Sequence, residues 1–348
     1  MKAAVLASYN HFEIREVPDP IAGNGQVVVR IKFASICGSD MHIFHGDFHP
    51  RTPVPFVPGH EMGGIIESVG EGVSGFKPGD KVAIDPIIWC RKCPACLAGH
   101  FPACTSLKLI GIDLDGGFCE KVAVPVSMLF RADSPVADEQ VALAEIYAIG
   151  FHANNRAGTR EGNTLAIWGA GRVGQVILQA ARTKTTGMIF IVDPVQKRLD
   201  IASKYYPGVI TINPLKENPL QVIRELTGGR GVDIAFEAVG HADELAGIPN
   251  PVRCCIQCIK GGGTVCVLGL GDDPAPVLFK EMIWKEARII ASRVSHGEFA
   301  EVLDNLSKGL LNPDALISAV LPADRIQEAF GLLEKDKSNY LKILLDFR

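Results

Sequence analysis

The sequence predicts an α/β protein in which a β-rich first domain is followed by a doubly wound parallel sheet. To about residue 148 of the 348-residue chain, short β-branched segments alternate with Gly and Pro turns. From about residue 160, buried apolar strands alternate with amphipathic helices, which is typical of a parallel sheet. A G-x-G-x-x-G run at 169–174 lies between the first of these strands and its helix.

The individual elements follow from hydrophobic period and turn residues. In the first domain we expect strands at 26–36, 63–70, 80–87 and 118–125. In the second we expect strands at 164–169, 188–193, 232–240 and 262–269, and helices at 172–184, 196–205 and 218–231. The tail should form helices at 298–311 and 323–336 and a closing strand at 340–347, packed back on the first domain. The expected domains are therefore 1–148, 149–288 and a return at 289–348.

The composition is that of a globular protein with a sizeable core, with 47% hydrophobic and 21% charged residues. The net charge of −4 argues against nucleic acid or an anionic membrane as partner. No apolar run is long enough to span a bilayer, and the apolar patch near Met1 is too short for a signal peptide. Ten cysteines without a signal favour metal ligands and buried thiols in a reducing compartment, so we expect a cytoplasmic protein.

Four cysteines with C-x2-C-x2-C-x7-C spacing predict a metal-bound lobe at about residues 88–106. They are Cys90, Cys93, Cys96 and Cys104. Repeated C-x-x-C spacing suits the tetrahedral four-thiolate coordination of Zn²⁺. Iron–sulfur proteins also use C-x2-C-x2-C, although the x7 gap argues against a cluster. Cys254, Cys255 and Cys258 have no nearby fourth ligand and are expected on one helix as small apolar residues, with Cys119 and Cys266 in strand cores.

The run Gly169-Ala170-Gly171-Arg172-Val173-Gly174 predicts a dinucleotide site, because it connects a strand to a helix. Gly169 permits the turn, Gly171 lets the backbone approach a pyrophosphate, and Gly174 lets the helix pack on the strand. Asp193 ends the next strand, where an acidic residue hydrogen-bonds the ribose and repels a 2′-phosphate. We therefore expect NAD rather than NADP, although Arg198 can either accommodate a phosphate or lie over the adenine.

A second group of candidate ligands lies upstream. Cys37, in ICGSDMH, and His60 and Glu61, in PGHEMGG, offer the sulfur, nitrogen and oxygen donors that Zn²⁺ accepts. We place them on neighbouring turns of the β-rich domain, where folding can bring them together.

Together these motifs resemble the zinc-dependent medium-chain dehydrogenases. GHEMGGIIESVGEGV (59–73) is similar to the family signature G-H-E-x2-G-x5-G-x2-V, and CGSDMH, the cysteine lobe, GAGRVG and Asp193 follow in the family's order. The similarity extends over essentially the whole chain and is strongest to the polyol (sorbitol-type) and L-threonine dehydrogenase branch. It implies a GroES-like catalytic domain, a Rossmann domain, an active site in the cleft between them, and a homodimer or homotetramer.

The resemblance also implies roles for single residues. Cys37 and His60 match catalytic zinc ligands, and Glu61 matches a ligand that exchanges with water in the polyol branch. Glu145, in LAEIYAIGFHA, matches an acidic residue that ligates the metal or holds its water. Ile146-Tyr147 departs from the usual Pro-Leu after this glutamate and leaves the size of the substrate open. The four lobe cysteines match the structural zinc site.

The expected chemistry is oxidation of an alcohol. Zn²⁺ would lower the pKa of the substrate hydroxyl. Ser39 would accept its proton and pass it through the nicotinamide ribose toward His42, with hydride transfer to the cofactor. Val239, Leu268 and Gly269 match segments that flank the nicotinamide.

The sequence thus favours a zinc-dependent oxidoreductase that transfers a hydride between NAD and a secondary alcohol such as a polyol or a sugar acid. L-Threonine 3-dehydrogenase is the alternative within enzymes. A non-enzymatic zinc-binding relative of the same fold is the alternative outside them.

Overall fold

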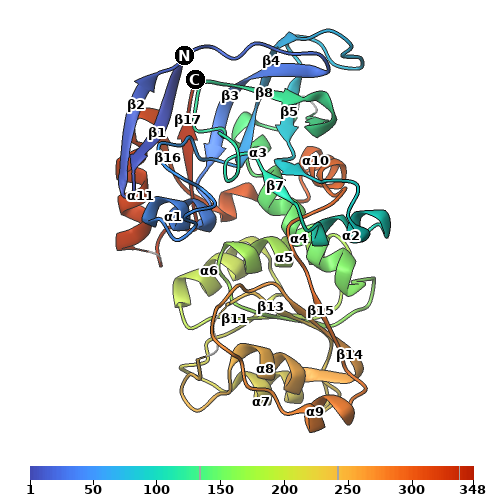
Figure 1. Cartoon of the computed structure of the whole chain (residues 1–348). Coiled ribbons are helices and arrows are strands. Elements are labelled where there is room, and N and C mark those ends of the chain that lie inside the picture. The colour runs from blue at the N-terminus through green and yellow to red at the C-terminus, as the bar shows by residue number, and fades with distance from the viewer. Residues whose placement is uncertain (133–134, 241–242, 337) are drawn as a thin grey trace. The chain divides into compact units, whose positions relative to one another are not determined.

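The computed structural model describes residues 1–132, 135–240, 243–336 and 338–348 (Figure 1). Its internal contacts divide the chain into two compact units, Met1–Ala148 with His296–Arg348, and Ile149–Ser295. The return to the first unit therefore begins at His296 and not at residue 289. The reason is that β15 (Arg288–Ala291) pairs with β14 (Ile259–Val267) and so belongs to the second unit's sheet.

The first unit is organised around one large sheet. Among the described residues its strand order is β16-β17-β3-β4-β5-β9, and β8 also pairs with β3. The strands are β3 (Gln26–Ser35), β4 (Glu61–Val69), β5 (Lys81–Ile84), β8 (Lys121–Pro125), β9 (Leu129–Arg131), β16 (Ile317–Pro322) and β17 (Lys342–Asp346). The backbones of β3 and β4 approach closely because Gly64 has no side chain, and a Cβ there would lie 2.1 Å from the carbonyl oxygen of Arg30.

Shorter elements surround this sheet. They are the hairpin β1 (Lys2–Ser8) and β2 (His11–Glu16), the strands β6 (Ile87–Ile88) and β7 (Lys108–Leu109), and the helices α1 (Gly38–His45), α2 (Pro94–Leu97), α3 (Asp138–Val141), α10 (Phe299–Ser307) and α11 (Ile326–Lys335). Four 3₁₀ turns cover Phe101–Ala103, Val126–Met128, Pro313–Ala315 and Ala323–Arg325. Cys37 was expected on a turn of the β-rich domain, and no helix was expected in the segment CGSDMH. It opens α1, because Cys37 is extended at the N-cap and the Asp40 carboxylate accepts its backbone N–H.

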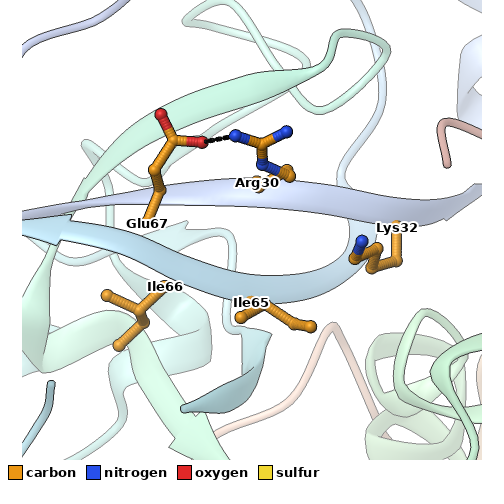
Figure 2. Close-up of a pocket in the computed structure, with 5 residues that line it drawn as sticks. All are labelled: Arg30, Lys32, Ile65, Ile66 and Glu67. Atoms are coloured by element: carbon orange, nitrogen blue, oxygen red, sulfur yellow. Dashed lines mark hydrogen bonds and ion pairs between the residues drawn. The ribbon is translucent and has the colours of Figure 1, made fainter. Parts of the chain in front are cut away.

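A surface hollow of about 340 Å³ lies over β3 and β4 and is lined by Arg30, Lys32, Ile65, Ile66 and Glu67 (Figure 2). The Arg30 guanidinium pairs with the Glu67 carboxylate across the two strands (Figure 2). The Lys121 ammonium also reaches Glu67, at 2.9 Å. Because Arg30 and Glu67 are already paired with each other and the hollow contains none of the expected ligand or cofactor residues, we assign it no part in the chemistry.

The second unit is a six-stranded parallel sheet with the order β12-β11-β10-β13-β14-β15 among the described residues. Its remaining strands are β10 (Leu165–Trp168), β11 (Ile189–Val192), β12 (Ile210–Ile212) and β13 (Val232–Glu237). Its helices are α5 (Arg172–Arg182), α6 (Gln196–Tyr205), α7 (Pro219–Leu226), α8 (Pro251–Cys258) and α9 (Phe279–Ile283), and α4 (Ala144–Ala157) contains the border between the units. None of the helices in the described part of the chain combines the length and apolarity that a bilayer crossing requires.

Two hydrophobic clusters cover the two faces of this sheet, which confirms the doubly wound expectation. Leu165 and Ile167 of β10 pack in one cluster, whereas Ala166 and Trp168 pack in the other. Successive strand residues point to opposite faces, so both faces of β10 are buried. Cys254, Cys255 and Cys258 lie on α8 inside the second cluster, as small apolar residues should.

Asp85, between β5 and β6, is a largely buried carboxyl group, and no cation pairs with it among the described residues. Its Oδ1 accepts the backbone N–H of Ile87 at 3.0 Å. Burial, reinforced by the negative charge of Glu298, raises the pKa of Asp85 to about 6. In the unfolded chain the group ionises at its ordinary value near 4, so the folded state binds the extra proton between about pH 4 and 6. The free energy of unfolding should therefore fall as the pH rises through this window.

We expect Asp85→Asn to increase stability above about pH 6, by up to about 3 kcal/mol, because the amide keeps the bond to Ile87 without the buried charge. Chemical denaturation between pH 4 and 8 measures this, and below pH 4 the two proteins should converge. Asp80→Asn is a control for which we expect the opposite effect, a loss of stability at neutral pH. Desolvation raises the pKa of Asp80, but the Lys77 N–H and Arg131 outweigh it and lower that pKa overall. A destabilised Asp85→Asn at pH 7 would contradict the assignment.

Candidate active site

The buried donor cluster of the first unit consists of Cys37, His60 and Glu61, whose ligand atoms all lie within 4.8 Å of one another. Cys37 caps the N-terminus of α1, His60 lies directly before β4, and Glu61 is the first residue of β4. The turn into β4 requires Gly59, which has a φ of +101°. A Cβ at this position would lie 2.4 Å from the ring of Phe118, so glycine is needed for both conformation and space.

Asp40 and Ser39, both on α1, support this cluster. The fully buried Asp40 carboxylate accepts the N–H of Cys37 at 2.8 Å through Oδ2, and its Oδ1 lies 3.5 Å from Nδ1 of His60. A carboxylate behind a ligating imidazole fixes the orientation and tautomer of the ring. Ser39 Oγ lies 3.4 Å from Nε2 of His60, so the predicted proton acceptor sits beside a candidate metal ligand.

Opposite charges hold the donor atoms in their ionised forms. Burial raises the pKa of the Cys37 thiol, but the positive charges of Lys342 and His60 outweigh it and lower that pKa overall. Burial likewise opposes ionisation of Glu61, and Lys342 and His60 again bring its pKa below the ordinary value. Burial also opposes protonation of His60, whose pKa is nevertheless raised by Asp40 and Cys37. The thiolate and the carboxylate are the forms of Cys37 and Glu61 that bind a metal ion, whereas His60 would bind it as the neutral imidazole, after release of its proton.

Two more ionisable groups border the cluster. The ammonium of Lys342, fully buried on β17, pairs with Oε1 of Glu61 and donates to the carbonyl of Ile36 at 3.4 Å. Glu145, in the first turn of α4, is 3% exposed and lies outside the 4.8 Å group. Burial raises the pKa of Glu145 to about 8, with the negative charges of Glu61 and Cys37 adding to the effect.

These residues fit Zn²⁺. Glu61 and Glu145 each have one buried oxygen without a hydrogen-bond partner in the described part of the chain. A buried polar atom without a partner destabilises the folded state, so each of these oxygens is expected to bind a ligand. Thiolate, imidazole and carboxylate are all zinc donors. Cys37, His60 and Glu61 would hold the ion, and Glu145 is placed to approach it.

The cysteine lobe is the second donor group that the described residues form. Cys90, Cys93, Cys96 and Cys104 place their sulfur atoms within 4.8 Å of one another, on the segment around α2. The backbone N–H groups of Cys90 and Cys93 point at the sulfurs of Cys104 and Cys90, at 3.4 and 3.3 Å. The N–H groups of Cys96 and Thr105 lower the pKa of Cys93 to about 5. Four thiolates complete a tetrahedron and leave no position for a substrate, as in a structural metal site.

The nucleotide loop follows β10 as the glycine pattern predicts. Gly169 has a φ of +99°, and Gly171 is the extended N-cap of α5, which Arg172 and Val173 open. A Cβ on Gly174 would lie 1.8 Å from the carbonyl oxygen of Gly169, so this helix can pack on the turn only with glycine. The strand order reverses between β11 and β13 on either side of β10, which is the topological position where such sheets bind nucleotides.

Asp193 follows β11 and ties this loop to the next. It is 3% exposed, its Oδ2 accepts the N–H of Ala170 at 2.8 Å, and its Oδ1 accepts that of Val195 at 2.8 Å. Nη1 of Arg198 lies 3.4 Å from Oδ2, so the arginine charge is shared with Asp193.

Val239, Leu268 and Gly269 lie where β13 and β14 end, at the carboxyl edge of the same sheet. The N–H groups of Val239 and Leu268 are bound by Glu237, through its carboxylate at 2.7 Å and its carbonyl at 2.9 Å. A Cβ on Gly269 would lie 2.3 Å from the backbone nitrogen of Gly240, so the two turns touch.

Comparison with known proteins agrees with this geometry. Residues 23–134 match the family described as "Alcohol dehydrogenase GroES-like domain", and residues 173–308 match "Zinc-binding dehydrogenase". The chain is 30% identical over 312 residues to the 2-dehydro-3-deoxy-L-galactonate 5-dehydrogenase of Pseudoalteromonas atlantica, covering 89% of this chain and 88% of the relative. The chain belongs to the zinc-dependent medium-chain alcohol dehydrogenase family.

This medium-chain dehydrogenase is also 30% identical over 339 residues to the L-threonine 3-dehydrogenase of Bacillus velezensis, covering 95% of each chain. The crystal structure of the alcohol dehydrogenase rspB from Escherichia coli CFT073 with NADH superimposes with a TM-score of 0.90 at 29% identity, covering 99% of both chains.

Membership in the family confirms the resemblance and the fold class expected from the sequence. The structure of this dehydrogenase gathers Cys37, His60 and Glu61 as expected and places Glu145 at the border of that group. Ile146 and Tyr147, which depart from the family pattern, are buried in α4.

Sequence reasoning missed Asp40 and Lys342. Asp40 was inside a motif that had been noted, and Lys342 interrupts an otherwise apolar strand, so both carried a signal.

Proposed function

We propose that the protein oxidises a secondary alcohol, a polyol or a sugar acid, with NAD as the hydride acceptor and Zn²⁺ held by Cys37, His60 and Glu61. The observation that supports this most is the three-donor cluster, in which one oxygen of Glu61 is buried without a hydrogen-bond partner in the described part of the chain, together with the nucleotide loop of the same chain. When bound, Zn²⁺ supplies a Lewis acid for the substrate hydroxyl, and NAD accepts the hydride from the adjoining carbon.

Two residues of α1 would move the proton released by this reaction. Ser39, whose Oγ lies beside His60, would accept the hydroxyl proton. His42 lies one helical turn further on, 61% exposed, with Nδ1 bound to Oδ2 of Asp47 at 2.8 Å. Residues three apart lie on the same face of a helix, so Ser39 and His42 are neighbours. The proton would therefore pass from Ser39 to the solvent-exposed imidazole of His42 over a short distance.

We expect Ser39→Ala to lower kcat by about 100-fold or more, the usual contribution of a positioned proton acceptor. Zinc content should be unchanged, because Ser39 is not one of the clustered donors. Ser68→Ala, an exposed serine on β4, is the matched control and should be silent. Normal turnover in Ser39→Ala would remove the serine from the proton path.

The negative charge of Asp193 is the reason to expect NAD rather than NADP as the cofactor. The substitution Asp193→Asn tests this expectation. The amide loses the charge that would repel a 2′-phosphate, and it can accept only one of the two N–H groups that the carboxylate now accepts. Hydrogen bonds to a charged group contribute about 1.5–3 kcal/mol, so kcat/KM for NAD should fall about 10- to 100-fold, with a smaller loss for NADP. Asp200→Asn, exposed on the same loop–helix segment, is the control. An unchanged ratio between the cofactors would contradict the role of Asp193.

The substrate class is tested with a panel of alcohols. NADH formation is followed by absorbance with polyols, sugar acids, L-threonine and simple secondary alcohols, each with NAD and with NADP. The relative that acts on 2-dehydro-3-deoxy-L-galactonate favours a sugar acid, and the relative named L-threonine 3-dehydrogenase is the reason to keep threonine as the second candidate. Zinc analysis belongs to the same experiment. About two zinc per chain supports the enzyme, whereas a filled lobe with an empty Cys37 cluster and no turnover would favour a non-enzymatic relative.

A further inference from the structure

Lys342 is a buried cation in a place where the fold alone does not require one. It lies on β17 within the run YLKILLDF, and its side chain is fully buried. Burying an ammonium group costs several kcal/mol unless it is paired. Its ion-pair partner is Glu61, which is 281 residues away in the sequence and is itself fully buried.

The strand order explains how the two meet. β17 pairs with β3, and β3 pairs with β4, so β3 lies between the lysine and the glutamate. Ser35 at the end of β3 is the direct neighbour of Glu61, and the N–H of Ile36 binds the carbonyl of Ile343. Lys342 on β17 and Glu61 on β4 therefore meet across the end of β3.

The ion pair between Lys342 and Glu61 makes the two carboxylate oxygens of Glu61 different from each other. Oε1 is bound by the ammonium, whereas Oε2 is buried without a partner in the described part of the chain. Only Oε2 is therefore available to a metal ion. A thiolate from Cys37, the carboxylate of Glu61 and the Asp40 carboxylate behind His60 would balance a divalent cation together with Lys342, and the ammonium of Lys342 is the positive charge that competes with the metal for Glu61.

We propose that Lys342 is a positioning residue that draws Glu61 toward itself, limits it to one oxygen for the metal, and so makes Glu61 the weak, exchangeable ligand. This inference rests on the proposed function, because it presumes a metal at the Cys37 cluster. Without the lysine, Glu61 would bind the metal more fully and would be harder for a substrate hydroxyl to displace.

The test replaces the metal of the cluster with Co²⁺ in the full-length protein and leaves zinc in the cysteine lobe. The visible absorption of Co²⁺ reports its ligand set without any substrate. In Lys342→Met we expect a changed Co²⁺ spectrum and metal binding tightened about 10-fold or more in competition with a chelator, since a repelling charge has gone. A lysine that only oriented Glu61 would give the opposite sign, because loss of such support typically weakens metal binding 10- to 100-fold.

A double-mutant cycle shows whether Lys342 acts through Glu61. In a Glu61→Gln background, Lys342→Met should leave the Co²⁺ spectrum unchanged. Lys121→Met removes another Lys–Glu pair of the same sheet, with Glu67, and should alter neither property. Lys342→Gln keeps a hydrogen-bond donor without the charge, and the same tightening is expected of it if Lys342→Met does not fold.

The outcomes separate this inference from the proposed function. An unchanged spectrum and unchanged or weaker binding in Lys342→Met would overturn the inference and leave the metal site standing. A spectral change of equal size in the Glu61→Gln background would also overturn it. Both the inference and the proposed metal chemistry fail if the unmutated protein binds no Co²⁺ at the Cys37 cluster. Such binding would be recognised by its loss in Cys37→Ser.

Discussion

Replacing Cys37 by serine should abolish turnover, with a loss of about 1,000-fold or more, while the protein stays folded. The hydroxyl of serine is not ionised at neutral pH and is a poor zinc ligand, so the buried cluster would keep only His60 and Glu61 as close donors. A 1,000-fold loss corresponds to about 4 kcal/mol of transition-state stabilisation. Zinc analysis should find about one ion per chain in place of about two, and circular dichroism should be unchanged.

Cys119→Ala is the matched control for this change. Cys119 is a buried thiol of the same unit whose sulfur donates to the carbonyl oxygens of Gly116 and Lys121, and it lies outside both donor groups. Its loss should cost some stability and leave zinc content and turnover intact. If Cys37→Ser retained both zinc ions and normal turnover, the cluster would have no catalytic role.

Replacing Cys96 by serine should lower stability with much less direct effect on the chemistry. Cys96 is the buried member of α2, and a structural metal site contributes its binding energy to folding. A loss of about 3 kcal/mol would lower Tm by about 6–12 °C for a domain of this size. Differential scanning calorimetry and limited proteolysis of the segment 88–106 measure this, and Arg91→Ser, exposed in the same loop, is the control.

The same experiment decides between zinc and an iron–sulfur cluster in the lobe. A zinc lobe is colourless and loses one zinc per chain in Cys96→Ser, whereas a cluster absorbs visible light and contains iron. An unchanged Tm together with full metal content would show that Cys96 is not a ligand.

The sequence predicted best those sites whose residues are close together along the chain. The four lobe cysteines lie within a segment of fifteen residues, from Cys90 to Cys104, and their spacing alone indicated a tetrahedral site. The loop from Gly169 to Gly174 is likewise local, and the apolar alternation around it predicted the doubly wound sheet. The helix at 38–45 was missed because its signal is a cap, Cys37 with Asp40, and not a hydrophobic period.

The sequence by itself determined the kinds of donors, the nucleotide loop and the alternation of strands and helices, because each is encoded within a few tens of neighbouring residues. Only the tertiary structure decided which donors meet. Cys37 and His60 come together through the pairing of β3 with β4, and Lys342 reaches Glu61 from the last strand of the chain. Sequence patterns report local period and spacing, whereas the charge balance of a buried site depends on groups that strand pairing brings from far along the chain. Glu61 is therefore recognisable as a ligand from its motif, but its pairing with Lys342 is visible only in the fold.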